Sequence, residues 1–143
     1  MCLNLKYLFI ILLSFYFTIN EQKIKDPKKF ISDVIIDTHG DFKYILMEMV
    51  NKTNLNDYKY LIRGSNQFDF HKRLYLDFMQ NNVYKYPDIY KSYSFKVLGG
   101  GRIAFKGYDI LVYGESGVYG KANHKLTCNL LKLKFPSYNI KDF

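Results

Sequence analysis

The chain has 143 residues and a formal net charge of +8, from 21 Lys and Arg against 13 Asp and Glu. That length excludes a TIM barrel, a complete Rossmann dehydrogenase and a protein kinase, yet it suffices for one domain with a packed core. An apolar fraction of 48% and an aromatic fraction of 18% argue against disorder. The positive charge predicts an anionic partner without deciding among nucleic acid, a lipid headgroup and a phosphorylated protein.

Residues 1–22 have the pattern of a secretory signal peptide. Lys6 precedes the largely apolar segment Tyr7–Ile19, which polar residues then end. This segment is shorter than the roughly 17–25 residues of a bilayer span. We therefore expect a cleaved leader and a secreted domain of residues 23–143 with no stable membrane association. An uncleaved signal anchor, a cytoplasmic chain and a buried N-terminal strand or helix are the alternatives.

The cysteine count fits a domain without disulfides. Cys2 lies in the leader, which leaves Cys128 alone and excludes an intrachain disulfide after cleavage. Asn51-Lys52-Thr53 is an N-glycosylation sequon that is usable only in the secretory pathway.

The first half of the domain predicts strands followed by a helix. The charged residues 21–29 predict a mobile lead-in. Strand-forming residues predict strands at residues 34–36, 42–50 and 58–63, and Gly64-Ser65-Asn66 breaks the last of these. A helix is expected over residues 67–80, with His71 on the inward stripe that Leu74, Tyr75 and Phe78 also occupy. Asn81, Asn82 and Pro87 predict a loop after it.

The second half repeats this order. Strands are expected at residues 93–98 and 103–105 on either side of a glycine triplet, and again at residues 109–113. A helix over residues 121–135 is expected to turn Ala122, Leu126, Leu130 and Leu133 inward, and residues 138–140 predict a last strand. The order predicts an α/β (α+β) fold with a single mixed β-sheet flanked by two helices.

Two glycine-rich segments are candidates for function. Gly99-Gly100-Gly101 weakens a strand, so close approach of a ligand or another backbone, a bulge that redirects Arg102, or a sheet bend must compensate. Residues 113–120 join a strand to a helix and can present backbone N–H groups to an anion, although an ordinary turn has the same pattern.

The histidines do not indicate a metal centre. No acidic or cysteine cluster stands at ligand spacing from His71 or His124, so no metal and no cofactor are expected. His71 on an apolar stripe has the usual place of a packed core residue. For His124, near a helix start, capping or anion contact competes with simple exposure.

Taken in order, these segments resemble the phosphohistidine phosphatase (Janus/Ocnus) family. The resemblance covers about residues 33–140. It rests on motifs that occur in the family's order: Gly40-Asp41-Phe42-Lys43-Tyr44, Ile62-Arg63-Gly64, Phe70-His71, Leu98-Gly99-Gly100-Gly101-Arg102-Ile103, Val112-Tyr113-Gly114, Tyr119-Gly120, His124 and the segment from Lys132 to Tyr138.

The resemblance implies a small fold with a mixed sheet and two helices, and the metal-independent removal of phosphate from phosphohistidine, and possibly phospholysine, in proteins. It implies that His71 is the catalytic residue, as general base or as transient nucleophile. The substrate-binding residues that it implies are Lys43, Arg102, Ser116, Gly117 and Val118. Arg63 and His124 match supporting residues.

Glu115 departs from the family pattern, because an aromatic residue is common at this place. Its carboxylate next to the phosphate loop leaves an alternative open, a catalytically weakened module that binds phosphorylated or acidic protein partners. Nucleic-acid binding is disfavoured, because stacking needs aromatic side chains exposed on a basic face and most here are expected in the core. We expect a monomer.

Overall fold

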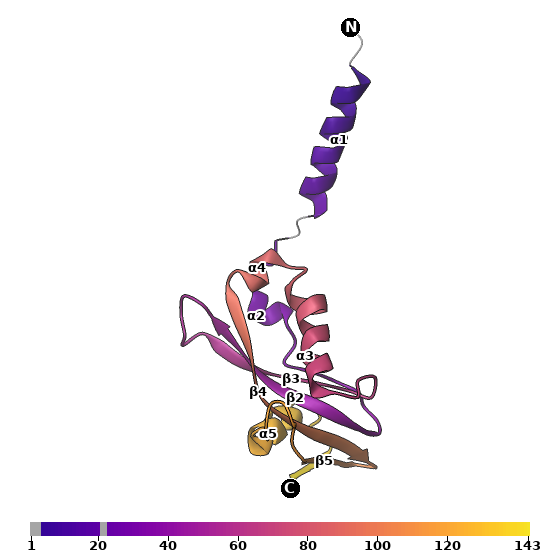
Figure 1. Ribbon diagram of the computed structural model, residues 1–143, viewed down its shortest axis with the longest axis vertical. Helices are drawn as coiled ribbons and strands as arrows, with labels where there is room; N and C mark the ends of the chain where they lie inside the picture. The colour runs from indigo at the N-terminus through magenta and orange to yellow at the C-terminus, as the bar shows by residue number, and fades with distance from the viewer. Residues whose placement is uncertain (1–3, 21–22) are drawn as a thin grey trace.

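The computed structural model describes residues 4–20 and 23–143, and only the backbone of residues 14–20 (Figure 1). Its elements, in chain order, are α1 (Leu5–Asn20), α2 (Pro27–Phe30), β1 (Val34–Ile36), β2 (Asp41–Asn51), β3 (Tyr58–Ser65), α3 (His71–Phe78), the π-helical segment η1 (Met79–Val83), α4 (Pro87–Tyr90), β4 (Tyr93–Lys106), β5 (Asp109–Tyr113), α5 (His124–Lys134) and β6 (Asn139–Asp142).

The six strands form one sheet in the order β1-β3-β2-β4-β5-β6. The pairs β1–β3 and β5–β6 are parallel, and the three central pairs are antiparallel. The predicted single mixed sheet is thus confirmed.

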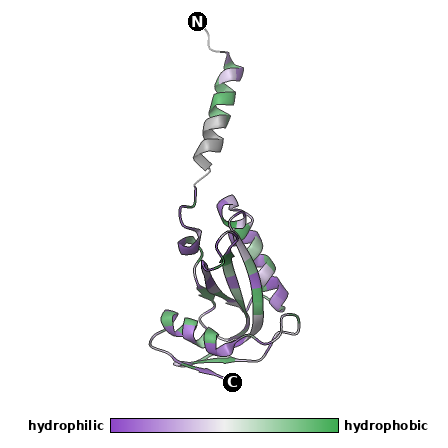
Figure 2. Ribbon diagram, turned by 90° about the vertical axis from the view of Figure 1, so that its left-hand side faces the viewer, coloured by the Kyte–Doolittle hydropathy of each residue, from purple (hydrophilic) through white to green (hydrophobic). Residues whose placement is uncertain are grey.

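Side chains of β2 alternate between two apolar layers, as the pleat of a strand requires. Tyr44 and Leu46 pack with Leu131 of α5 on one face. Ile45 and Met47, with the rest of the second layer, pack on the other face under α3 and α4. Figure 2 shows helices on both sides of the sheet. Both flanking helices were predicted, although the first begins at His71 instead of residue 67, and each face has its own core.

The expected loop after α3 is wrong. The chain continues from α3 into η1, where Met79 and Val83 are buried in the α3-side layer. Pro87 then occupies the first turn of α4, where its missing N–H costs nothing. Burial of these two residues, which are four positions apart, therefore keeps the segment helical despite Asn81 and Asn82.

The inward face predicted for this helix is confirmed in part, because Ala122 is buried and Leu126 and Leu130 pack against the core. His124, Thr127, Cys128 and Leu131 are buried, whereas Leu133 is 83% exposed. The helix begins at His124 instead of residue 121, with Asn123 as the N-cap that accepts from the Leu126 N–H. The Asn123 cap determines where the helix starts, and the apolar pattern alone did not reveal this polar signal.

The predicted mobile lead-in, residues 21–29, overlaps residues 24–33, which contact the domain and which we call the N-terminal strap. Lys28 forms a 2.6 Å ion pair with Asp57 of the β2–β3 connection. Lys59 of β3 donates to the Ile31 carbonyl and forms a 2.7 Å ion pair with Asp33. At the start of the strap, the Ile24 N–H donates to Asp88 of α4. These contacts make the strap part of the fold.

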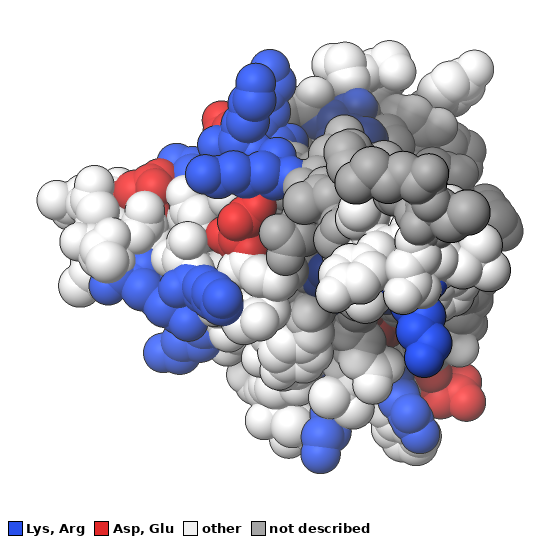
Figure 3. All heavy atoms as spheres, turned by 90° about the horizontal axis from the view of Figure 1, so that it is seen from above, with Lys and Arg blue, Asp and Glu red and all other residues white. Residues whose placement is uncertain are grey.

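The apolar segment near the start of the chain is the helix α1. Its described side chains Leu5 and Tyr7–Leu13 are exposed, so a buried N-terminal element is wrong for these residues. Within the described ranges, no helix is long and apolar enough to cross a membrane. Figure 3, which looks onto this end of the molecule, shows Lys and Arg side chains in several separate groups, with Asp and Glu side chains beside some of them. The cleavage expected after residue 22 falls outside the described residues and stays a prediction.

In the sequon at the end of β2, the side chain of Asn51 already makes hydrogen bonds within the protein. The Asn51 amide donates to Asp57 over 3.1 Å, and its carbonyl accepts from the backbone and the hydroxyl of Thr53. A glycan on Asn51 would replace one of the two hydrogens on the nitrogen that donates to Asp57.

Candidate functional site

The glycine triplet lies inside β4, which runs unbroken through it. A β-bulge shifts the pairing between Leu46 and Met47 of β2, opposite Gly99 and Val97. A Cβ on Gly99 would lie 2.6 Å from the backbone of Ala122. The close approach of other groups, together with a bulge, explains the triplet, and the expected break between two strands is wrong.

The two remaining glycines admit a histidine on each face of the strand. A Cβ on Gly100 would lie 2.8 Å from His71 Cδ2 and 3.0 Å from Ser116 Cβ. A Cβ on Gly101 would lie 2.7 Å from His124 Cε1. No side chain larger than hydrogen fits at either position without displacing its neighbours. The triplet thus brings His71 and Ser116 together.

His71 begins α3, and its imidazole is buried against β4. Its Nε2 lies 2.9 Å from the Gly101 carbonyl oxygen, which can only accept, so Nε2 carries the proton in the neutral ring. This leaves the lone pair on Nδ1. Burial is the main cause that lowers the pKa of His71, and the cations Lys43 and Arg102 lower it further. The ring is therefore neutral, with a basic nitrogen, at neutral pH.

Lys43 and Arg102 are direct cross-strand partners on β2 and β4. They lie on the α3 side of the sheet, where both affect His71. Arg102 is itself held, since its Nε donates to Asp41 Oδ1 over 2.9 Å. The hydroxyl of Tyr113, the partner of Arg102 on β5, donates to the other oxygen of the same carboxylate. A cationic pair beside a neutral histidine can hold a phosphoryl group.

Ser116 anchors the glycine-rich loop. It is buried, and its backbone exchanges two hydrogen bonds with Gly120, which closes the turn. Its hydroxyl oxygen accepts from the N–H groups of Val118 and Tyr119, at 3.3 and 3.1 Å. Because these two N–H groups already donate to Ser116 Oγ, an anion bound at this turn would replace that oxygen as their acceptor. Gly117 and Val118 are exposed on this turn.

His124 lies on the opposite face, buried beneath the triplet. Its Nε2 donates to the Gly114 carbonyl over 2.7 Å, and its Nδ1 accepts from the Tyr44 hydroxyl at 2.7 Å. The Thr127 hydroxyl lies 3.1 Å from the Tyr44 oxygen and completes the chain of bonds. Neither capping nor exposure, the alternatives considered from sequence, describes it. His124 fixes Gly114, where the loop that carries Ser116 begins.

Arg63 lies outside this cluster. Its guanidinium donates to the carbonyls of Ser32, Asp33 and Ile62, and it stacks 5.0 Å above the ring of Phe78 at the far end of α3. Burial lowers its pKa to about 10, which still leaves it charged at neutral pH. Its contacts support the strap, and through Phe78 the helix that carries His71.

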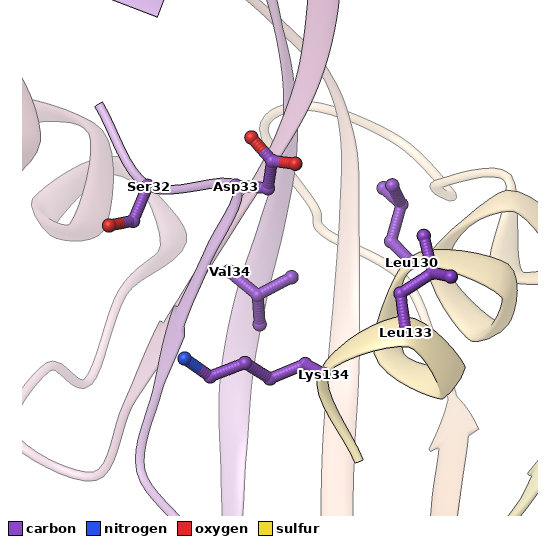
Figure 4. Close-up of a pocket in the computed structure, with 6 residues that line it drawn as sticks. All are labelled: Ser32, Asp33, Val34, Leu130, Leu133 and Lys134. Atoms are coloured by element: carbon purple, nitrogen blue, oxygen red, sulfur yellow. The ribbon is translucent and has the colours of Figure 1, made fainter. Parts of the chain in front are cut away.

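Two further features bear on function: a hollow in the surface and the placement of side chains that could bind a metal ion. A hollow of about 280 Å³ lies between the residues before β1 and the end of α5, lined by Asp33, Leu133 and Lys134 among others (Figure 4). It contains none of the predicted catalytic or binding residues. Across the described residues, no group of three or more His, Cys, Asp or Glu could hold a metal ion.

Comparison with known proteins assigns the chain to a family. The model of the Janus/Ocnus family matches residues 28–139. The chain belongs to the Janus/Ocnus family. It is 33% identical over 116 residues to the 14 kDa phosphohistidine phosphatase of Sus scrofa, covering 77% of this chain and 87% of that protein. The protein of the same name from Homo sapiens is 32% identical over 116 residues, covering 77% and 88%. The sex-regulated protein janus-A of Drosophila pseudoobscura pseudoobscura is 32% identical over 114 residues, covering 76% and 72%.

In this Janus/Ocnus chain, sequence reasoning missed three members of the cluster. Asp41 and Tyr113 stood within recognised motifs but had no assigned role, and neither had Tyr44. Asp41 and Lys43 are two apart on β2, which places them on one face, but the predicted strand began at residue 42 and left Asp41 out. The partners of Asp41 are Arg102 on β4 and Tyr113 on β5. They depend on the order and the register of the strands, which the sequence does not show.

Proposed function

We propose that the protein is a metal-independent protein phosphohistidine phosphatase that hydrolyses the P–N bond of phosphohistidine in proteins, with phospholysine as a second candidate substrate. The observation that carries this proposal is the neutral His71, held by Gly101 with a free Nδ1 lone pair, beside the cations Lys43 and Arg102. The relatives named phosphohistidine phosphatase support it.

The chemistry needs positioning more than activation. Water attacks phosphorus and its proton passes to Nδ1 of His71; as the P–N bond breaks, this proton passes on to the substrate nitrogen, which leaves protonated, and His71 returns to its neutral form. In the nucleophilic alternative Nδ1 attacks phosphorus itself, and water then hydrolyses the phosphorylated ring. Lys43 and Arg102 stabilise the charge on the equatorial oxygens, and so do N–H groups of the Ser116 loop once they donate to the phosphoryl group instead of to the Ser116 hydroxyl. No step requires a metal ion or another cofactor.

The partner and the location follow the same reasoning. The excess of Lys attracts an acidic or phosphorylated protein surface, and this steering weakens as salt increases. We propose a secreted monomer that does not associate stably with membranes after its leader, residues 1–22, is removed. An uncleaved leader would anchor the same domain, and detection of the full-length chain only in the cytosol would contradict both locations.

The decisive experiment is phosphate release from a phosphohistidine-containing protein in the presence of EDTA. The purified full chain should turn over, and His71→Ala should reduce the rate to the uncatalysed level. Full activity in His71→Ala would overturn the role of His71. Single-turnover trapping of a phosphorylated His71 separates nucleophile from general base.

A second candidate function is a catalytically weakened module that binds phosphorylated or acidic partners. Exposed Glu115 favours it, because it adds a carboxylate next to the Ser116 turn. A pure binding module should show no turnover either as it stands or as Glu115→Tyr, while it still retains the phosphorylated protein.

A further inference from the structure

Asp41 stands within the cationic side of the site and contacts two of its members. Its Oδ1 accepts from Arg102 Nε at 2.9 Å, and its Oδ2 accepts from the Tyr113 hydroxyl. Its backbone carbonyl also accepts from Arg102 Nη2 at 3.3 Å. Both carboxylate oxygens are thus occupied by groups from β4 and β5. Such a complete set of partners holds the guanidinium in one orientation.

The pair with Arg102 also changes the charge that an anion meets. Lys43 and Arg102 are the two cations that influence His71, and Asp41 offsets one of them. Side-chain exposures of 34% for Arg102 and 44% for Asp41 mean that solvent screens the pair only in part. Of these two cations, Arg102 is therefore paired with Asp41, whereas Lys43 is not.

We propose that Asp41 is the positioning residue that sets the charge of the phosphoryl site. It clamps Arg102 with the help of Tyr113, and it offsets the guanidinium charge so that a phosphoryl group is held mainly through Lys43. Binding of the dianionic product, inorganic phosphate, is thereby weakened, which favours its release. This inference rests on the proposed function for the identity of the product, but the electrostatic claim holds for any oxyanion at the site.

The test compares the full chain with neutral and charged variants of Asp41. In Asp41→Asn an amide oxygen still accepts from Arg102 while the negative charge is lost, and Asp41→Ser is a second neutral variant. Asp41→Glu retains the charge. Asp109→Asn is the matched control, because Asp109 is a carboxylate at the other end of β5 that accepts from Asn139. Two quantities are measured: the Kd for inorganic phosphate by calorimetry, and the pKa of His71 by NMR titration.

The neutral variants should bind inorganic phosphate more tightly, by roughly three- to tenfold at low salt, and the gain should shrink as salt increases. The pKa of His71 should fall by roughly 0.3 pH units, because the charge of Arg102 is no longer offset. For Asp41→Glu and Asp109→Asn, the Kd for inorganic phosphate should stay within roughly twofold of its value in the unchanged chain. The pKa of His71 should stay within roughly 0.1 pH units.

An unchanged or weaker phosphate affinity in both neutral variants, together with an unchanged pKa of His71, would overturn the inference. A purely structural role of Asp41 predicts that outcome, with loss of stability alone. If the unchanged chain binds no phosphate, the proposed function loses its support at this site, and the pKa of His71 in the variants still decides the inference. The two failures are therefore distinguishable.

Discussion

His71 and His124 contact the same strand from opposite faces, and adjacent glycines make room for them. A side chain on Gly100 would collide with the ring of His71, and one on Gly101 with the ring of His124. The two rings also bond to backbone carbonyls on either side of the site, those of Gly101 and Gly114. The position of each ring is therefore fixed by backbone atoms of β4 and of the loop after β5.

Gly100→Ala should disturb the face of the site that holds His71 and Ser116. Its Cβ would meet His71 and Ser116 as well as the Tyr44 carbonyl at 2.9 Å, and backbone cannot yield. We expect destabilisation of about 1–3 kcal/mol and a loss of phosphatase activity of at least roughly tenfold, measured by denaturant unfolding and by phosphate release. Gly117→Ala is the stability control, because no atom lies within 4 Å of its Cβ position. Equal stability of the two variants would contradict the packing described.

The acid limb of the pH–rate profile should report His71. Its neutral form is the active one and its pKa is lowered, so kcat/KM should hold as pH falls to 6.5 and decline only below it. Lys43→Met should lower kcat/KM by roughly 10²-fold and move the acid limb to higher pH, since a cation beside the ring is lost. Because Lys43 lowers this pKa more than Arg102 does, Arg102→Gln should move the limb less. A limb that stays in place in both variants would show that another group titrates.

Stability should fall on acidification as the buried histidines become charged in the unfolded chain. Burial lowers the pKa of His71 and of His124, so the folded protein binds fewer protons than the unfolded one below pH 6.5. Their contribution is complete above pH 6.5 and is lost as pH falls through the folded values, at no more than about 1.4 kcal/mol per pH unit for each ring. Denaturant unfolding of His124→Gln should show a shallower loss between pH 7 and 5.5.

The control for that titration is His39→Gln, since His39 is exposed in the turn before β2. It should lose stability with the same slope as the unchanged chain. A slope in His124→Gln that matches both would mean that His124 does not contribute to the acid loss.

Tyr44→Phe should destabilise the fold through one hydroxyl. The hydroxyl is buried between His124 and Thr127, and its removal leaves Nδ1 of His124 without its donor. We expect a loss of about 1–3 kcal/mol in the free energy of unfolding. Tyr108→Phe changes a ring that is 82% exposed and should stay within about 0.5 kcal/mol. A Tyr44→Phe variant as stable as Tyr108→Phe would exclude a role of this hydroxyl in the fold.

The sequence predicted the fold well where periodicity was strong. The strands at residues 34–36 and 109–113 have the expected bounds, and alternation along β2 separates two buried layers. It failed where tertiary contacts override local signals. Asparagines inside η1 read as a loop, and the glycine triplet read as a break, because burial and close packing leave no trace in local composition.

For the candidate site, the sequence placed His71 and the Ser116 turn correctly near each other only through the family resemblance. Composition and spacing alone left His71 as a packed core residue and the loop as an ordinary turn. The pairing of Lys43 with Arg102, and of Arg102 with Asp41, depends on the register between β2 and β4. Asp41 and Arg102 are 61 positions apart in the sequence, so no local pattern relates them.

The strap determines which way the site faces when the chain is tethered by its N-terminus. Ile24 is bound to α4, which follows the C-terminal end of α3, while His71 begins that helix at the other end of the domain (Figure 1). A retained leader, a fusion partner or a solid support joined at residue 23 would therefore direct the phosphoryl site outward. We expect protein immobilised through residue 23 to keep its solution kcat/KM for a macromolecular substrate, whereas attachment at Val118 should obstruct it.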